Sequence, residues 1–298
     1  MSFTAFNAHV VSSQRLSPSF QRIRLGGLKQ MGPAGPVRDL RIKLIFPGRA
    51  GLPTFPPGNW YEHWVTLDPT TRGDMRTYSI RNAYPERGEI DVDFVLHTAP
   101  GATGPASAWA ASARAGDEIV VCGPARDDAS GVGIEFAPGS ASQIHLFGDE
   151  TALPAIARIV DEWPTTPLGP TGTVHVEVPY PQDQQILAAP NGVQVRYYPR
   201  QGHAHGAALL DAAASLLSTS VPEREEAEGD MTWETPAFSA LGEEISGELD
   251  TPHGDAYYWI AGESSLVTTM RRMLVKQAGI PRNNVSFMGY WRQGRAGS

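Results

Sequence analysis

The chain has 298 residues, of which 41% are hydrophobic and 19% charged, which is enough for two globular domains of ordinary size. With a net charge of −8, the chain lacks the excess of basic residues that nucleic-acid binding requires. No stretch approaches the roughly 18 consecutive apolar residues of a membrane span. Cys122 is the only cysteine, which excludes an internal disulfide and a CxxC metal or iron–sulfur site.

The N-terminus has neither the basic start nor the apolar run of a secretory signal. We therefore expect a cytoplasmic protein with no nucleic-acid partner, no stable membrane insertion and no resident metal, and we favour a monomer. The charge is unevenly spread. Residues 1–139 hold 14 Lys and Arg against 13 Asp and Glu, whereas the remainder holds 10 against 19.

Residues 1–139 predict short β-strands separated by turns rich in glycine and proline. The expected strands are Phe3–Arg15, Gln21–Leu25, Leu40–Phe46, Trp64–Leu67, Met75–Tyr84, Glu89–Thr98 and Glu118–Cys122. One helix, Pro105–Arg114, precedes the last of them. Many short strands at this spacing favour a β-barrel or a sandwich.

Residues 140–298 alternate between strands and helices. The expected strands are Gln143–Phe147, Thr173–Val178, Val193–Tyr198, Ala256–Ile260 and Asn284–Met288, and the expected helices are Ala155–Trp163, Ala207–Leu217 and Ser265–Ala278. This alternation predicts a mostly parallel α/β sheet with helices on both faces. Ser264 is the expected N-cap of the last helix, and Gly279 is expected to end it.

Between the last two strand–helix groups lies an acidic segment, residues 222–250. It has ten acidic residues against one basic residue, Arg224, and little apolar periodicity. We expect a mobile, solvated insertion, with a docking role as the alternative.

The first motif with possible chemistry is Arg76-Thr77-Tyr78-Ser79-Ile80-Arg81, on a predicted strand. It supplies a cation for a diphosphate, a flat ring for a flavin and a small hydroxyl for flavin N5. On a regular strand Arg76, Tyr78 and Arg81 cannot share one face, so a twist or bulge is required. An ordinary amphipathic strand is the alternative interpretation.

The second motif is HTAPGATGPASAWA, residues 97–110, in which a glycine-rich turn leads into a helix. The free N–H groups at such a helix start suit a pyrophosphate. Ser107 adds a hydroxyl and Trp109 a ring for stacking. A structural turn with a buried tryptophan is equally compatible, and His97 is then only a hydrogen-bonded strand end.

Two further motifs follow strands of the second half. Gly148-Asp149-Glu150-Thr151 opens a helix at the first crevice of the sheet, where dinucleotides bind, but it lacks the GxGxxG pattern. Asp149 and Glu150 are awkward neighbours for a bare phosphate. WIAGE, residues 259–263, ends a later strand, and GYWR, residues 289–292, offers an aromatic pair near the end of the chain.

In this order, RTYSIR, HTAPGATGPASAWA with AGDEIVVCGPA, GDETALPAI and WIAGE followed by GYWR resemble the siderophore-interacting protein family, the FAD-dependent ferric-siderophore reductases. The resemblance covers most of the chain. It implies a six-stranded antiparallel FAD-binding β-barrel over residues 1–139 and an NAD(P)H-binding α/β domain over residues 140–298, a layout of the ferredoxin-reductase type. The implied activity is NAD(P)H-dependent reduction of siderophore-bound Fe(III).

The resemblance also implies roles for single residues. FAD should be bound by Arg76, Thr77, Tyr78, Ser79, His97, Gly104, Pro105, Ala106, Ser107 and Trp109. The nicotinamide cofactor, NADH or NADPH, should lie beside Thr151, Ala261, Gly262, Glu263 and Trp291. The anionic ferric siderophore should be attracted by Lys43, Arg126 and Arg292. Electron transfer needs no general acid or base, so no catalytic side chain is named.

Three features depart from the family pattern. Acidic residues follow Arg126 in GPARDDASG, and the 222–250 segment is longer than the family connection. Glu177 ends a strand where an acid can bind ribose hydroxyls and repel a 2′-phosphate, which favours NADH. Three other functions stay open: a broad-specificity flavin or ferric-chelate reductase, a non-catalytic siderophore-binding protein, and a carbohydrate- or protein-binding barrel.

Overall fold

The computed structural model describes residues 3–56, 58–96, 104–164, 169–223, 233–235 and 255–294. The chain forms two compact units that divide between Ile134 and Glu135, five residues before the expected boundary. The Glu135 carbonyl oxygen accepts hydrogen bonds from Tyr257 and Ser286 (3.2 and 3.1 Å), and Phe136 packs edge-on against Tyr257. These contacts fasten the segment after Ile134 to the second unit.

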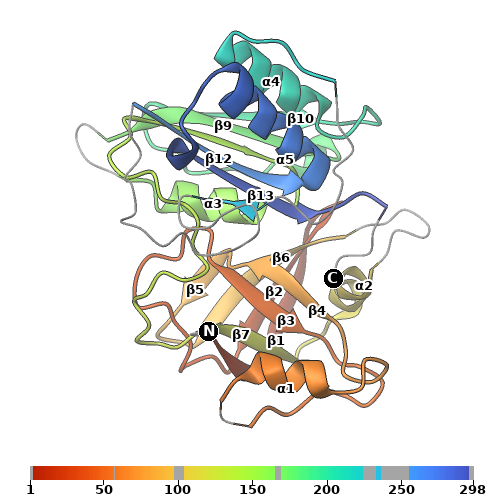
Figure 1. The fold of residues 1–298 in the computed structure, drawn as a ribbon. Helices are drawn as coiled ribbons and strands as arrows, with labels where there is room; N and C mark the ends of the chain where they lie inside the picture. Colours follow the sequence, from red (N-terminus) through yellow and green to blue (C-terminus); the bar gives the residue numbers. More distant parts are fainter. Residues whose placement is uncertain are drawn as a thin grey trace. The chain divides into compact units, whose positions relative to one another are not determined.

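The first unit is an antiparallel sheet with the strand order β4-β3-β7-β1-β2-β6-β5 (Figure 1). Its strands are β1 (Phe3–Ser17), β2 (Phe20–Gly26), β3 (Arg41–Ile45), β4 (Met75–Ser79), β5 (Asn82–Tyr84), β6 (Glu89–Val95) and β7 (Glu118–Pro124). Helix α2 (Pro105–Ser112) precedes β7. The predicted antiparallel class is confirmed, with seven strands in place of six.

The additional strand arises from a bend in the predicted strand Met75–Tyr84. This segment forms both edges of the sheet, β4 and β5, which are separated only by Ile80 and Arg81. Ile80 is fully buried, and the Arg81 N–H donates to the carbonyl oxygen of Asp91 on β6 (2.8 Å). The sheet therefore curls until its two edges meet at this bend.

Side-chain bonds hold the closing strand in place. Asp91 accepts from Arg24 of β2 (2.7 Å) and from Asn82 and Tyr84 of β5 (3.0 and 2.9 Å). Asp91 is only 1% exposed, so its burial depends on these donors. The bonds attach β5 to β6 directly after the bend.

The predicted strand Trp64–Leu67 is wrong, because these residues belong mainly to helix α1 (Trp60–Thr66). The side chain of Asn59 caps the helix by accepting two backbone N–H groups of its first turn. Trp60 is buried against Ile45 and neighbouring residues of β7. Cap and packing together outweigh the strand preference of the aromatic residues.

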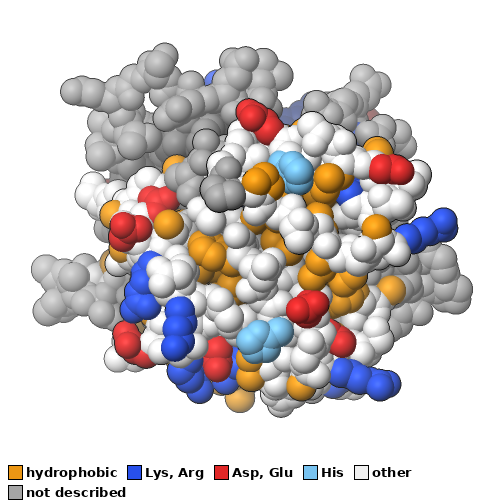
Figure 2. All heavy atoms as spheres, turned by 90° about the horizontal axis from the view of Figure 1, so that it is seen from below, with side chains coloured by type: hydrophobic (Ala, Val, Ile, Leu, Met, Phe, Trp, Pro, Cys, Tyr) orange, Lys and Arg blue, Asp and Glu red, His pale blue; other side chains and the backbone are white. Residues whose placement is uncertain are grey.

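The exposed side of α1 carries Tyr61 and Val65. Figure 2 shows the face of the molecule on which α1 lies, where apolar side chains form separate patches and charged side chains of both signs are interspersed. Within the described part of the chain, none of the helices has the length and apolar character needed to cross a membrane.

The second unit is a six-stranded sheet with the order β10-β9-β8-β12-β13-β11. Its strands are β8 (Gln143–Gly148), β9 (Thr171–Val178), β10 (Val193–Pro199), β11 (Trp233–Glu234), β12 (Ala256–Glu263) and β13 (Val285–Trp291). Its helices are α3 (Leu153–Asp161), α4 (Ala207–Leu217) and α5 (Ser264–Arg271). All strands except β11 are parallel, with α3 on one face and α4 and α5 on the other (Figure 1), which confirms the predicted α/β class.

The last long helix differs from its prediction at its start. The N-cap is Glu263, whose carboxylate accepts the N–H groups of Ser265 and Leu266 (2.9 and 3.1 Å), and not Ser264. A π-helical turn, Arg272–Gln277, continues the helix. Gly279 ends it with a φ of +67°, as predicted.

The acidic segment 222–250 contains an unpredicted edge strand. Trp233 and Glu234 form β11, which pairs antiparallel with Met288 and Phe287 of β13. Pro222, Glu223 and Thr235 are the other described residues of the segment, and the predicted mobility of the rest lies outside the described residues.

Candidate functional site

Arg76 and Tyr78 of β4 lie on the core side of the first sheet. In the ladder with β3, Tyr78 is opposite Ile42 and Arg76 is opposite Leu44, and both of these partners are fully buried. Side chains alternate along a strand, so Thr77 lies on the other side. The bend after β4 separates Arg81 from this set, as the motif requires.

Arg76 makes only weak contacts of its own. Its guanidinium donates to the carbonyl oxygen of Met75 (2.9 Å) and pairs with Asp74 at 3.4 Å. Asp74 is half exposed, and such a surface pair contributes little. Arg76 can therefore exchange Asp74 for a stronger anion. Ser79, on the face opposite Tyr78, is buried.

The strand and the glycine-led helix share one aromatic cluster. The ring of Tyr78 lies 4.4 Å from that of Phe94 on β6, and the Phe94 ring lies 5.9 Å from Trp109 of α2. Trp109 also packs edge-on against Phe46 at 5.3 Å. The first unit thus brings the two predicted FAD segments together around Phe94.

The start of α2 fits an anionic group. Gly104 occupies the N-cap position, Pro105 begins the helix, and no side chain among the described residues caps it. A Cβ placed on Gly104 would meet nothing within 4 Å, so the space beyond is open. Ala106 and Ser107 are buried in the first turn. The N–H groups at such a helix start suit a diphosphate. His97, and residues 97–103 generally, lie outside the described residues.

Two predicted substrate-binding cations belong to the first unit. Lys43 of β3 is opposite Thr77, whose hydroxyl accepts from its ammonium at 2.7 Å. Burial, followed by the nearby charge of Arg41, lowers the pKa of Lys43. By strand alternation Lys43 lies on the face opposite Arg76 and Tyr78.

Arg126 lies beyond β7 and is about half exposed. It donates to the carbonyl oxygen of Lys29 (3.0 Å) and is 4.0 Å from Glu86. It borders an open hollow that Gln30 and Asp127 also line. Asp127 beside it reduces the positive charge of this hollow, as the sequence indicates.

In the second unit, the predicted nucleotide residues meet where the strand order reverses. From β8 the chain continues to β9 on one side, whereas β12 pairs with β8 on the other. Ligands of such sheets bind at the carboxyl ends of the strands at this switch point. Thr151 follows β8, and Ala261, Gly262 and Glu263 end β12.

Asp149 is the centre of this crevice, although it is absent from the predicted set. One carboxylate oxygen accepts the N–H and the hydroxyl of Thr151 (2.9 and 2.6 Å). The other accepts from the Glu263 N–H (2.8 Å) and Trp291 Nε1 (2.9 Å) and pairs with His205 (3.2 Å). Burial alone would raise the pKa of Asp149, but His205 and these hydrogen bonds lower it to about 2.

Just before α3, the Thr151 N–H is therefore already bound by a carboxylate, and the Leu153 N–H at the helix start is bound by the Asp149 carbonyl oxygen (3.1 Å). Burial lowers the pKa of His205, but its pairing with Asp149 outweighs this and the pKa is raised. Glu263 is likewise occupied, because it caps α5 and accepts the Gln293 N–H at 3.3 Å. Both acids at this switch point are thus engaged by groups of the protein itself.

Glu177 does not have the ribose-binding role proposed from the sequence. It is 1% exposed, and its carboxylate accepts from Arg200 (3.0 Å) and from the Gly206 N–H (2.8 Å). Arg200 also binds Glu150 with two bonds, of 2.7 and 2.6 Å. The acid is neutralised within the unit, so the argument for NADH that rested on it fails.

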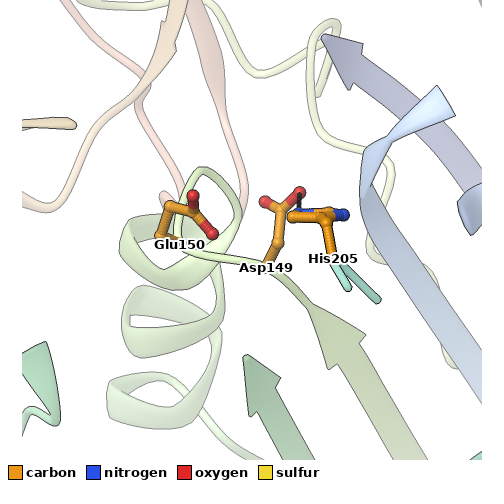
Figure 3. A group of neighbouring side chains, drawn as sticks. All are labelled: Asp149, Glu150 and His205. Carbon is orange, nitrogen blue, oxygen red and sulfur yellow. Dashed lines mark ion pairs between the residues drawn. The ribbon is translucent and has the colours of Figure 1, made fainter. Parts of the chain in front are cut away.

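Asp149, Glu150 and His205 have the composition of a metal site, and their ligand atoms lie within 4.8 Å of one another. In Figure 3 Asp149 and His205 point toward each other, whereas Glu150 lies to the other side. Arg200 binds Glu150, and the Asp149 oxygens are taken by protein donors. The cations that these acids need are thus supplied by the chain itself.

Comparisons with known proteins agree with this geometry. Residues 9–128 match the family model of the siderophore-interacting FAD-binding domain, and residues 141–294 match that of the siderophore-interacting protein. A ferric vibriobactin reductase of Vibrio cholerae is 25% identical, over 96% of this chain and 88% of its own. An NADPH-dependent ferric-chelate reductase of Escherichia coli is 25% identical, over 95% and 91%.

A solved structure supports the fold over nearly the whole length. The siderophore-interacting protein SipS from Aeromonas hydrophila is 27% identical and superposes with a TM-score of 0.68, covering 99% of this chain and 94% of its own.

Proposed function

We propose that this chain, which belongs to the siderophore-interacting protein family, is an FAD-dependent reductase of ferric siderophores that takes electrons from NADH or NADPH. The observation that carries the proposal lies in the first unit. There Tyr78, on the strand that also carries Arg76, and Trp109 of α2 both pack against Phe94. A helix start that suits an anion, a cation and a flat ring, on two elements that pack against the same phenylalanine, are what a flavin dinucleotide needs.

When bound, FAD would supply the chemistry of accepting hydride from the nicotinamide and passing single electrons to Fe(III). The protein's part is binding and positioning. We assign Arg76 and the first turn of α2, Gly104–Ser107, to the diphosphate, and Tyr78 to the isoalloxazine ring. Trp109 at the adenine and the contacts of Thr77, Ser79 and His97 stay predictions.

The second unit would receive the nicotinamide end of NADH or NADPH beside Thr151, Ala261 and Gly262. Because the Asp149 carboxylate already accepts the Thr151 and Glu263 N–H groups, we place the diphosphate of this cofactor away from them. Trp291 would border the nicotinamide. Since Arg200 neutralises Glu177, a preference between the two cofactors has to be measured.

The substrate would be an anionic iron chelate. Lys43, Arg126 and Arg292 are assigned to its attraction, because a hard-oxygen chelate of Fe(III) often carries negative charge. Reduction to Fe(II) weakens binding by such ligands and releases the metal. We place the activity in the cytoplasm, consistent with the single buried thiol of Cys122.

The test is the absorbance spectrum of the purified protein, followed by anaerobic titration with NADH and NADPH and capture of Fe(II) from a ferric siderophore. We expect a flavin spectrum, bleaching by at least one nucleotide, and Fe(II) release that depends on that nucleotide. A protein that stays colourless after FAD is added, or that reduces no ferric siderophore, would contradict the proposal. Equal rates with siderophores, simple iron chelates and free flavin would instead support a broad-specificity reductase, as the name of the E. coli relative suggests.

Replacing Lys43 by alanine should raise the KM for an anionic ferric chelate about three- to tenfold and the KM for a neutral chelate less than twofold. The reason is the loss of one positive charge from the attracting set, which salt should mask. Steady-state kinetics with both chelates at low and high ionic strength measure this. Lys276→Ala, an exposed lysine of the second unit, serves as the control. Equal increases for both chelates would remove the electrostatic role.

A further inference from the structure

The end of the chain is fastened to the crevice at two neighbouring points. Trp291 Nε1 donates to the carboxylate of Asp149 at 2.9 Å, and the Gln293 N–H donates to that of Glu263 at 3.3 Å. Arg292 lies between these tethers. The side chain before this cation and the backbone after it are therefore held by two buried acids, Asp149 and Glu263.

The backbone around Asp149 is shaped to bring its carboxylate this close. Gly262 has a φ of +145°, and a Cβ added there would lie 2.6 Å from Asp149 Oδ2. Any other residue would be strained at this φ and would collide with the acid. The end of β12 thus requires glycine both for this φ and for the close approach of Asp149.

Asp149 is unsuited to direct chemistry. It is fully buried, its pKa is lowered to about 2, and both oxygens already accept from Thr151, Glu263 and Trp291. It therefore has no capacity left to bind a ligand or to take a proton near neutral pH. His205, its ionic partner, packs edge-on against the Trp291 ring at 5.3 Å and 84°.

We propose that Asp149 is a positioning residue that holds Trp291, and through it Arg292, at the end of β13. One buried carboxylate would then position two groups: the ring of Trp291, which borders the nicotinamide, and the cation of Arg292, which attracts the iron chelate. The identity of these two ligands rests on the proposed function, whereas the tether does not.

The kinetic test is Asp149→Asn, which keeps the size of the side chain but loses its charge. We expect the KM values for the nicotinamide cofactor and for the anionic chelate both to rise about tenfold, with kcat within about twofold, because binding geometry is lost and the reacting groups are not. Glu150→Gln is the matched control. Glu150 is the adjacent, equally buried acid, and its bonds go to Arg200, so both KM values should stay within about twofold.

The second readout is the 15N indole resonance of Trp291 in protein without cofactors, assigned by its loss in Trp291→Phe. It should shift in Asp149→Asn and stay in place in Glu150→Gln. An unmoved resonance, or wild-type KM values for both ligands in Asp149→Asn, would overturn the proposal. If Asp149→Asn does not fold, Trp291→Phe removes the same bond and keeps a ring. Unchanged KM values in that variant would equally overturn it.

Failure of the proposed function gives a different result. A protein that oxidises neither NADH nor NADPH would refute the reductase assignment. The indole resonance would still show whether Asp149 holds Trp291.

Discussion

Replacing Arg76 by alanine is expected to raise the Kd for FAD by about ten- to a hundredfold. A hydrogen bond from a charged donor contributes about 1.5–3 kcal/mol, and each 1.4 kcal/mol corresponds to a factor of ten. Among the described residues, Arg76 has a bond to the Met75 carbonyl oxygen and a weak pair with half-exposed Asp74 to lose when it turns to a diphosphate. Little of the energy that Arg76 gains from the FAD diphosphate is therefore offset by lost contacts, and most of it should contribute to the affinity for FAD.

The measurement is a fluorescence titration of flavin-free protein with FAD, together with the flavin-to-protein absorbance ratio after dialysis. Arg76→Lys should fall between wild type and alanine, because lysine keeps the charge but not the planar fork. Arg15→Ala, an exposed arginine of the β1–β2 hairpin, should leave the Kd unchanged. Wild-type affinity in Arg76→Ala would disprove the diphosphate assignment.

The architecture could be predicted because both halves carry strong local patterns. Alternation in β6 and the strand–helix rhythm after residue 140 are visible within short windows. Helix α1 was missed because its start depends on Asn59 and its packing on Trp60, which contacts residues about 60 positions away on β7. The RTYSIR motif indicated a bend near Ile80, because its residues could not share one face of a regular strand. That this bend closes the sheet could not be predicted, because it depends on the distant residue Asp91.

The site was predictable only where its parts are contiguous in sequence. The Arg76–Ser79 strand and the Gly104–Ser107 turn each carry their own signal. Asp149, by contrast, binds partners 114 and 142 residues away, so no local window relates them. The same limit explains the error at Glu177 of β9, whose charge is neutralised by Arg200, 23 residues away and just after β10. The clue that the sequence did offer for Asp149 was the presence of two adjacent acids, Asp149 and Glu150, where a phosphate was expected.

Acidification from pH 7 to pH 5 should destabilise the second unit strongly through two buried histidines. His145 of β8 and His175 of β9 both hydrogen-bond the Thr173 hydroxyl (2.8 and 3.0 Å), and His175 also bonds Tyr198 (2.8 Å). Their rings stack on neighbours, His145 on Tyr258 and His175 between Phe147 and Tyr198. Burial lowers the pKa of each from 6.5 to about 4, with the charge of Arg196 contributing at His175.

These shifts fix the direction and the pH window. Because the folded pKa lies below the unfolded one, the unfolded chain binds more protons between pH 6.5 and pH 4. The contribution of the two histidines to stability is therefore complete well above pH 6.5 and falls as the pH decreases toward 4, by about 4 kcal/mol at pH 5 for the two together. Asp149 and His205 do not account for this loss. The low pKa of Asp149 acts only below about pH 4, and the raised pKa of His205 favours the folded state in acid.

Urea-induced unfolding of the second unit, followed at pH 7, 6 and 5, measures its free energy of unfolding at each pH. His175→Gln should be less stable than wild type at pH 7, since its ring contacts are lost, yet it should lose only about half as much stability between pH 7 and pH 5. His203→Gln, an exposed histidine, should keep the full wild-type slope. A wild-type slope in His175→Gln would show that protonation of another group drives the acid unfolding. The informative quantity is the change in the free energy of unfolding with pH, because it separates the cost of protonating a buried ring from the packing that the ring provides.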